Sequence, residues 1–192
     1  MKTRETERRI DMEYLEAMKG RRSIRKFTEQ KVSRETLEKI VEAARFAPTW
    51  KNSQTARYVA VEDRALIDRI ADEATMGREH NRGIIRSCQT LIVLTSVKGI
   101  CGYEPDGSFS TNKGNEWQMF DAGIAAEAFT TTAYNFGVAS VIMGIFSDEK
   151  VGELIGLDDS RVVSALIAIG FPDQPPREPV RKDVSEYLTF IP

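Results

Sequence analysis

The residues best suited to chemistry lie in one short basic segment, R-R-S-I-R-K-F, at positions 21–27. Four of its first six residues are cations, and Ser23 adds a neutral hydroxyl donor. Arginine presents a planar fork of N–H donors that matches phosphate, and several donors on one phosphate make charge-assisted hydrogen bonds. Near the other end of the chain, Arg177, Arg181 and Lys182 form a second basic group. The two groups indicate anion binding, but a solvated basic turn has the same composition, so both interpretations stay open.

Outside these cations the sequence offers few reactive side chains. His80 is the single histidine, and its polar surroundings favour a solvated surface residue over a member of a catalytic triad. Cys88 and Cys101 lack the spacing of a zinc site and are expected to be reduced thiols. The pair Asp158 and Asp159 is typical of a turn, and neither a G-x-G-x-x-G fingerprint nor a P-loop motif is present. This composition favours an enzyme whose chemistry is carried by a phosphorylated cofactor.

Length, charge and hydropathy exclude several classes of protein. A chain of 192 residues fits a single domain, 1–192, and buries enough surface to fold without a disulfide or metal. The net charge of -2 disfavours a general binder of nucleic acid or of anionic membranes. No long apolar run and no secretory signal is apparent, so we expect a cytoplasmic protein without a membrane or nucleic-acid partner. Residues 1–10, which are mostly charged, are expected to form a disordered extension.

Alternating helical and strand patterns must position the basic groups. Periodicity and capping residues predict helices within 11–20, 33–48, 63–74, 116–136 and 147–156, capping and terminating residues included. Apolar runs with β-branched residues predict strands at 57–61, 89–97, 138–143 and 162–169. The remaining segments are two loops at 48–56 and 98–115, the second long enough to form a lid, and an extended segment at 171–182. Residues 183–191 are expected to form a terminal strand or helix.

Several blocks, in order along the chain, resemble the FMN-dependent nitroreductase family. Segment 21–27 is similar to its R-x-S-x-R/K-x-F opening, A-A-R-F-A-P-T-W-K-N-S-Q at 43–54 to its A-x-x-A-P-S-x-x-N-x-Q loop, and 121–137 to its long central helix. Further similar blocks lie at 142–144, 154–157, 167–172 and 181–187. The likeness therefore runs from about residue 13 to the C-terminus. It departs from the family at Thr49, where serine is common, and in the short glycine-rich loop 98–115.

The resemblance implies a phosphate site for FMN and a charge beside its ring. Arg21, Arg22 and Ser23 are expected at the phosphate and ribityl chain, and Arg181 is expected to complete the phosphate site. Arg25 is expected near the N1/O2 edge of the flavin, where a guanidinium stabilises the negative charge of the reduced ring.

The resemblance also implies contacts to the isoalloxazine ring. Asn52 is expected to hydrogen-bond the ring or the ribityl chain, with Gln54 as a further candidate beside it. Met143 and Gly144 are expected near flavin N5, with a backbone N–H directed to N5, since glycine permits close approach. Judged from the residues alone, Asn52 also suits a plain turn and Met143 suits the core, so these alternatives stay open.

The fold implied by the resemblance is α+β, a mixed central sheet flanked by helices, in an intertwined homodimer with FMN at the interface. The nearly all-apolar part of the central helix, 121–136, agrees with a buried place at this interface. Its polar exceptions, Asp121 and Glu127, are expected either to bond across the interface or to be solvated. Trp50 and Trp117 are expected to pack or to lie at the dimer contact rather than to stack on a ring.

The activity implied is a two-electron reduction. A hydride passes from NADH or NADPH to flavin N5, and then to a small-molecule acceptor such as a nitroaromatic, a quinone or a similar conjugated electrophile. No side chain is expected to act as general acid or base. The alternatives are another reduction on the same flavin scaffold, such as dehalogenation or enoate reduction, or a flavin-binding redox sensor without turnover.

Overall fold

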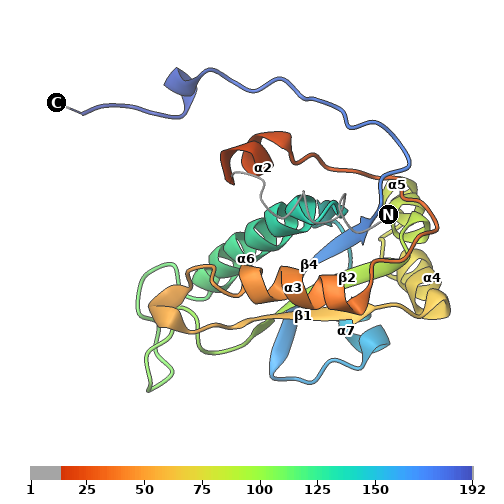
Figure 1. Ribbon diagram of the computed structural model, residues 1–192. Helices are drawn as coiled ribbons and strands as arrows, with labels where there is room; N and C mark the ends of the chain where they lie inside the picture. The colour runs from red at the N-terminus through yellow and green to blue at the C-terminus, as the bar shows by residue number, and fades with distance from the viewer. Residues whose placement is uncertain (1–13, 192) are drawn as a thin grey trace.

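The computed structural model describes residues 14–191 of the chain. The expected extension, residues 1–10, and the expected helix cap Asp11 lie outside the described residues. A four-stranded sheet forms the centre of the fold, with helices against both of its faces (Figure 1). Its strands are β1 (Ala56–Val61), β2 (Thr90–Val97), β3 (Ala139–Met143) and β4 (Arg161–Gly170), in the order β1-β2-β4-β3. Each strand lies within one residue of its predicted bounds.

The strands of this sheet pair antiparallel, and one parallel bridge extends it at the β3 edge. The bridge joins Ser23 to Ser140, and next to it the Ile24 N–H donates to the Ser140 carbonyl at 3.0 Å. The basic segment 21–27 therefore lies along the outer edge of the sheet. The predicted α+β class, with a central sheet between helices, is confirmed.

The central strands are buried on both faces, which explains their continuous apolar runs. In β2, Leu91 and Val93 belong to one hydrophobic cluster, whereas Ile92 and Leu94 belong to the other. Successive side chains of a strand point to opposite faces of the sheet, so a strand that is covered on both sides needs no polar positions.

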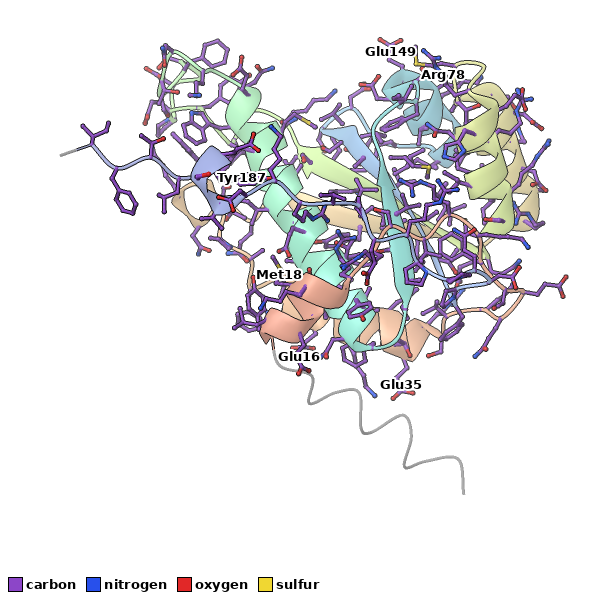
Figure 2. All side chains as sticks on the ribbon, turned by 90° about the horizontal axis from the view of Figure 1, so that it is seen from above. Glu16, Met18, Glu35, Arg78, Glu149 and Tyr187 are labelled. Carbon is purple, nitrogen blue, oxygen red and sulfur yellow. The ribbon has the colours of Figure 1, made fainter. Side chains whose placement is uncertain are left out.

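One face carries α2 (Tyr14–Gly20), α3 (Arg34–Ala44) and α6 (Glu116–Asn135); in Figure 2, Met18 of α2 and Glu35 of α3 lie on one side of the molecule, opposite Arg78 and Glu149. Ser33 begins α3 as predicted, because its hydroxyl accepts the Thr36 N–H at 3.1 Å. Phe129 of α6 is fully buried between this face and the sheet. Neither α6 nor any other helix among the described residues is long and apolar enough to cross a membrane.

The other face carries α4 (Arg64–Glu73), α5 (Glu79–Ser87) and α7 (Asp148–Ile155). The sequence predicted no helix between α4 and β2, and the presence of α5 corrects this. Its first turn is polar, and its N-cap Arg78 makes no side-chain capping hydrogen bond, so the usual signals of a helix start are missing. The helix forms because Ile84 and Ile85 are buried in the cluster that contains α4.

The C-terminal tail leaves the sheet after β4 and runs out past α2, so that its last described residues lie far from the body of the protein (Figure 1). The Asp173 N–H donates to the Lys26 carbonyl at 3.0 Å, which attaches the start of the tail to the basic segment. Beyond this point every described residue is exposed, and Val180 reaches 96%. The first part of the tail is extended as predicted. The expected terminal strand or helix at 183–191 is wrong, since only one 3₁₀ turn, η2 (Val184–Glu186), forms within the described residues.

Candidate functional site

The basic segment begins where α2 ends and continues along the edge of β3. Gly20, the last residue of α2, lies so close to α6 that a Cβ atom there would meet the Tyr134 hydroxyl at 2.6 Å. The segment then runs beside β3, and the Ile24 side chain there is buried. Its neighbours Ser23 and Arg25 consequently lie nearer the surface.

Arg21 and Arg22 line a cavity of about 190 Å³, here called the arginine cavity, between the ends of α2 and α6 and the start of the tail. The Arg22 guanidinium donates to the carbonyl of Arg21 at 2.9 Å and to that of Lys19, and it lies 3.6 Å from the Glu178 carboxylate. Its Nε atom is buried and meets no hydrogen-bond partner among the described residues, and the same holds for Ser140 Oγ on the cavity wall. An unmatched buried donor costs about 1–3 kcal/mol, so the cavity suits a ligand that accepts hydrogen bonds.

Two arginine side chains, Arg21 and Arg22, line the arginine cavity, and the charge of Arg181 also acts on Arg21. Arg21 is half-buried, and this burial lowers the pKa of its guanidinium. The Glu127 carboxylate acts in the opposite direction, while the positive charges of Arg181 and Arg22 lower the pKa of Arg21 further. Arg181 itself is exposed on the tail and is not among the residues that line the arginine cavity. The structure thus places two of the residues that the resemblance implied for the phosphate site, Arg21 and Arg22, on the wall of one cavity.

A second cavity, of about 600 Å³, adjoins the first and shares Pro176 with it. Its wall carries Ser23, Arg25, His80 and Arg177, and it is called the histidine cavity below. The Arg25 guanidinium donates to the Ser23 carbonyl at 3.3 Å. His80 is exposed as predicted, but sequence reasoning missed its place beside Arg25 because it missed α5, the helix that carries it.

The segment after β3 is open to solvent and is fixed to α5. The Met143 side chain is buried in the core, which agrees with the interpretation of Met143 as a core residue. Gly144 is exposed, and a Cβ atom there would meet nothing within 4 Å among the described residues. The Asn81 side chain donates to the Ile145 carbonyl at 2.9 Å, so this segment is held by the helix that also carries His80.

Asn52 and Gln54 lie on a strained loop before β1, residues 49–54, which is called the amide loop below. It contains the 3₁₀ turn η1 (Trp50–Asn52), and φ is positive at three of its residues: 46° at Lys51, 54° at Asn52 and 49° at Gln54. Residues other than glycine avoid this region, and exceptions cluster at functional sites. Asn52 and Gln54 are exposed, and the Gln54 amide donates to the Asn52 carbonyl at 3.4 Å.

The two groups of predicted residues lie at opposite ends of α6. Tyr134, at its C-terminal end, lines the arginine cavity, whereas Asp121, near its N-terminal end, is bonded to the amide loop. Gln54 lines a different cavity, together with Thr49. A single chain therefore does not bring Asn52 and Gln54 to the arginines.

Asp121 departs from its expected position. It is 3% exposed, and its Oδ2 atom accepts the Trp50 N–H at 2.8 Å and the Cys101 thiol at 3.2 Å. The expectation that Asp121 is solvated is therefore wrong, since its carboxylate is buried and bonds within its own chain. The Trp50 N–H, at the first position of η1, has no intrahelical acceptor and is satisfied by Asp121, while the Thr49 hydroxyl accepts the Gln54 N–H at 3.0 Å.

The sequence matches the model of the nitroreductase family over residues 18–171. The chain belongs to the nitroreductase family. The matched region of this family member contains the basic segment, the amide loop and all four strands, and it ends before Arg181. The resemblance drawn from the sequence is thereby confirmed.

Relatives of this nitroreductase-family chain agree with it in sequence and fold. A nitroreductase family protein from Clostridium novyi NT is 29% identical, with a TM-score of 0.73 and coverage of 87% of this chain and 89% of the other. A Desulfovibrio desulfuricans protein with a provisional nitroreductase name, solved in complex with FMN, is 25% identical, with a TM-score of 0.76 and coverage of 95% and 98%. An Archaeoglobus fulgidus protein with the provisional name NADH dehydrogenase/NAD(P)H nitroreductase is 27% identical over 164 residues, 83% of this chain and 86% of the other.

Proposed function

We propose that this nitroreductase-family protein is an FMN-dependent NAD(P)H oxidoreductase. It passes a hydride from NADH or NADPH to flavin N5 and then to a nitroaromatic, a quinone or a similar conjugated electrophile, in a ping-pong sequence. FMN is bound in the Desulfovibrio desulfuricans relative, and the Archaeoglobus fulgidus relative is named for NAD(P)H. The observation that carries the proposal is the arginine cavity, whose donors match a phosphate monoester.

The arginine cavity fits the phosphate of FMN by its charge and by its donors. The charges of Arg21, Arg22 and Arg181 outnumber those of the nearby carboxylates Glu127 and Glu178. A phosphate there accepts hydrogen bonds from several guanidinium groups at once, including the buried Nε atom of Arg22. It also offsets the repulsion between arginines that contributes to the lowered pKa of Arg21.

The histidine cavity and the segment after β3 fit the flavin ring. Arg25 faces this cavity, and a guanidinium at the N1/O2 edge stabilises the negative charge that the ring gains on reduction. Gly144 leaves its backbone open to a flat ring. We assign a backbone N–H at Met143–Gly144 to flavin N5. Because solvent provides the proton of the product, none of these side chains needs to act as a general acid or base.

We assign Asn52 and Gln54 to the flavin of a second copy of the chain. Both amides are exposed at the end of α6 that lies away from the arginine cavity. A two-fold homodimer brings the amide loop of one chain to the arginine cavity of the other and makes two equivalent sites. Exposed apolar side chains of the tail, such as Phe190 at 84% and Ile191 at 92%, support a dimer because a partner surface removes them from water.

The absorbance spectrum of the purified protein tests this function. We expect a yellow protein whose flavin spectrum is bleached by NADH or NADPH without oxygen and is restored by a quinone or a nitroaromatic. A colourless protein that takes up no added FMN contradicts the cofactor assignment. Bound FMN that neither nucleotide reduces contradicts the oxidoreductase activity and favours a redox-sensing module.

A further inference from the structure

A buried carboxylate connects two loops at the N-terminal half of α6. Asp121 stands next to small apolar residues that the helix buries, such as Ala122 and Ala125, yet it brings a charge out of water. Two neutral donors accommodate this charge, the Trp50 N–H and the Cys101 thiol, and both reach the same Oδ2 atom. A buried carboxylate is tolerated where such hydrogen bonds are made, so these contacts distinguish Asp121 from an ordinary core residue.

The amide loop needs an attachment outside itself. Its internal hydrogen bonds, such as that from the Ser53 N–H to the Trp50 carbonyl at 2.8 Å, close the turn without fixing it to the body of the protein. Three non-glycine residues of the loop have positive φ, which costs conformational free energy and therefore disfavours the closed turn. The bond from Trp50 to Asp121 ties the first residue of η1 to α6, and the Trp50 ring packs on Trp117 of the same helix with ring centroids 4.9 Å apart.

We infer that Asp121 is a positioning residue for flavin binding: from α6 it fixes Trp50 and thereby directs Asn52 and Gln54 toward the flavin of the second copy. The inference rests on the proposed function, which assigns these two amides to FMN. Asp121 is remote from the arginine cavity in the same chain, so it acts only through the amide loop.

Cys101 extends the same connection to the glycine-rich loop 98–115. Burial, together with the adjacent Asp121 carboxylate, raises the pKa of the Cys101 thiol to about 12. The thiol therefore stays protonated at neutral pH and remains a hydrogen-bond donor. One carboxylate oxygen thus holds the amide loop and the glycine-rich loop in a fixed relation to each other.

The affinity of the apoprotein for FMN, measured by the quenching of flavin fluorescence, tests this role. Asp121→Ala is expected to weaken FMN binding about tenfold, because loss of a hydrogen bond to a charged group frees the loop. Asp121→Asn keeps the shape and one neutral acceptor and is expected to lose less. The matched control is Asp63→Ala, which removes a carboxylate that accepts the Leu66 N–H at 2.8 Å at the start of α4. This control lowers helix stability and is expected to leave FMN affinity within about twofold of the wild type.

Riboflavin, which lacks the phosphate, separates positioning from general damage. Because the amide loop contacts the ring or ribityl part, Asp121→Ala is expected to lower the affinities for FMN and riboflavin by the same factor. Arg21→Ala is expected to lower the affinity for FMN alone. Unchanged FMN affinity in Asp121→Ala, or a loss confined to FMN, overturns the inference.

A measurement without flavin keeps this inference distinct from the proposed function. The near-ultraviolet circular dichroism of the apoprotein reports the Trp50–Trp117 pair, and both Asp121 variants are expected to change it while Asp63→Ala does not. If the wild type binds no flavin, the proposed function fails, whereas this spectrum still shows whether Asp121 fixes Trp50. An unchanged spectrum in Asp121→Ala contradicts the inference, whatever the protein binds.

Discussion

Arg21 and Arg25 belong to one short segment, but they face different cavities. Arg21 is half-buried beside Arg22 and within reach of the charge of Arg181, whereas Arg25 is exposed at the histidine cavity. In the proposed site the first arginine contributes to holding the phosphate, and the second contributes to the charge balance of the ring. Substituting each in turn therefore separates cofactor affinity from cofactor potential.

Arg25→Ala is expected to lower the midpoint potential of the bound flavin and to slow its reduction by NAD(P)H, with little change in FMN affinity. Arg21→Ala is expected to weaken FMN binding by about tenfold to a hundredfold, as loss of a charge-assisted hydrogen bond implies, with little change in potential. Potentiometric titration and flavin-binding titration of both variants make the comparison. A larger effect of Arg25→Ala on affinity than on potential identifies Arg25 as a phosphate ligand instead.

At the scale of single residues, the sequence predicted the groups that carry charge and missed the ones that depend on distant contacts. Arg21 and Arg22 were singled out by their basic side chains and by the resemblance, and the structure places both on the wall of one cavity. Asp121 was not recognised as a loop anchor, since nothing local indicates that a residue of α6 accepts the N–H of Trp50. Such a pairing depends on the tertiary fold and leaves no pattern in the sequence.

At the scale of secondary-structure elements, a strong hydrophobic pattern was sufficient to predict an element from the sequence, and a weak pattern was not. The apolar runs of β2 and β4 predicted strands that are buried on both faces. α5 was missed because its short sequence buries just Ile84 and Ile85, and tertiary packing rather than local preference makes it helical. The place of His80 beside Arg25 was lost with it.

Tyr58 of β1 connects the sheet to α6 and makes this contact sensitive to alkaline pH. Its hydroxyl donates to the Ala125 carbonyl at 3.0 Å, and burial raises its pKa to about 12. The unfolded chain loses this proton near pH 10, so the contribution of Tyr58 is complete below pH 10 and is lost as the pH rises through 12. Tyr58→Phe is expected to lower the free energy of unfolding by about 1 kcal/mol at pH 7. Above pH 10 the difference between the two proteins is expected to shrink, because phenylalanine does not ionise.

Urea unfolding at neutral pH and at about pH 10.5 measures this difference. The control is Tyr187→Phe, since Tyr187 is 71% exposed on the extended tail (Figure 2). It is expected to leave the free energy of unfolding unchanged at both pH values. A constant difference between wild type and Tyr58→Phe across this range shows that Tyr58 does not link proton loss to unfolding.

At the scale of the whole molecule, one chain carries two half-sites, the arginine cavity and the amide loop, and a tail that extends away from the body of the protein. The arginine cavity and the amide loop lie at opposite ends of α6, and the tail extends away from the body with its apolar side chains exposed (Figure 1). These features share one explanation in a two-fold dimer, in which each half-site meets its complement on the partner.

Mixed dimers test this arrangement directly. If each flavin is held by the arginine cavity of one chain and the amide loop of the other, then Arg21→Ala and Asn52→Ala chains each lose both sites as homodimers. A heterodimer of the two variants places both defects in one site and leaves the other site intact. After co-expression with two different affinity tags and purification through both, it is expected to bind about half as much FMN per dimer as the wild type, which has two equivalent sites.

The matched control pairs Arg21→Ala with Arg181→Ala, two substitutions in the same half-site. In that heterodimer each site carries one defect, so FMN binding is expected to stay as weak as in either parent homodimer. Recovery in the first heterodimer without recovery in the control requires that the arginine cavity and Asn52 of one site come from different chains. No recovery in the first heterodimer, with both parents impaired, shows instead that each chain holds its flavin alone, and the assignment of Asn52 and Gln54 to the partner site then fails.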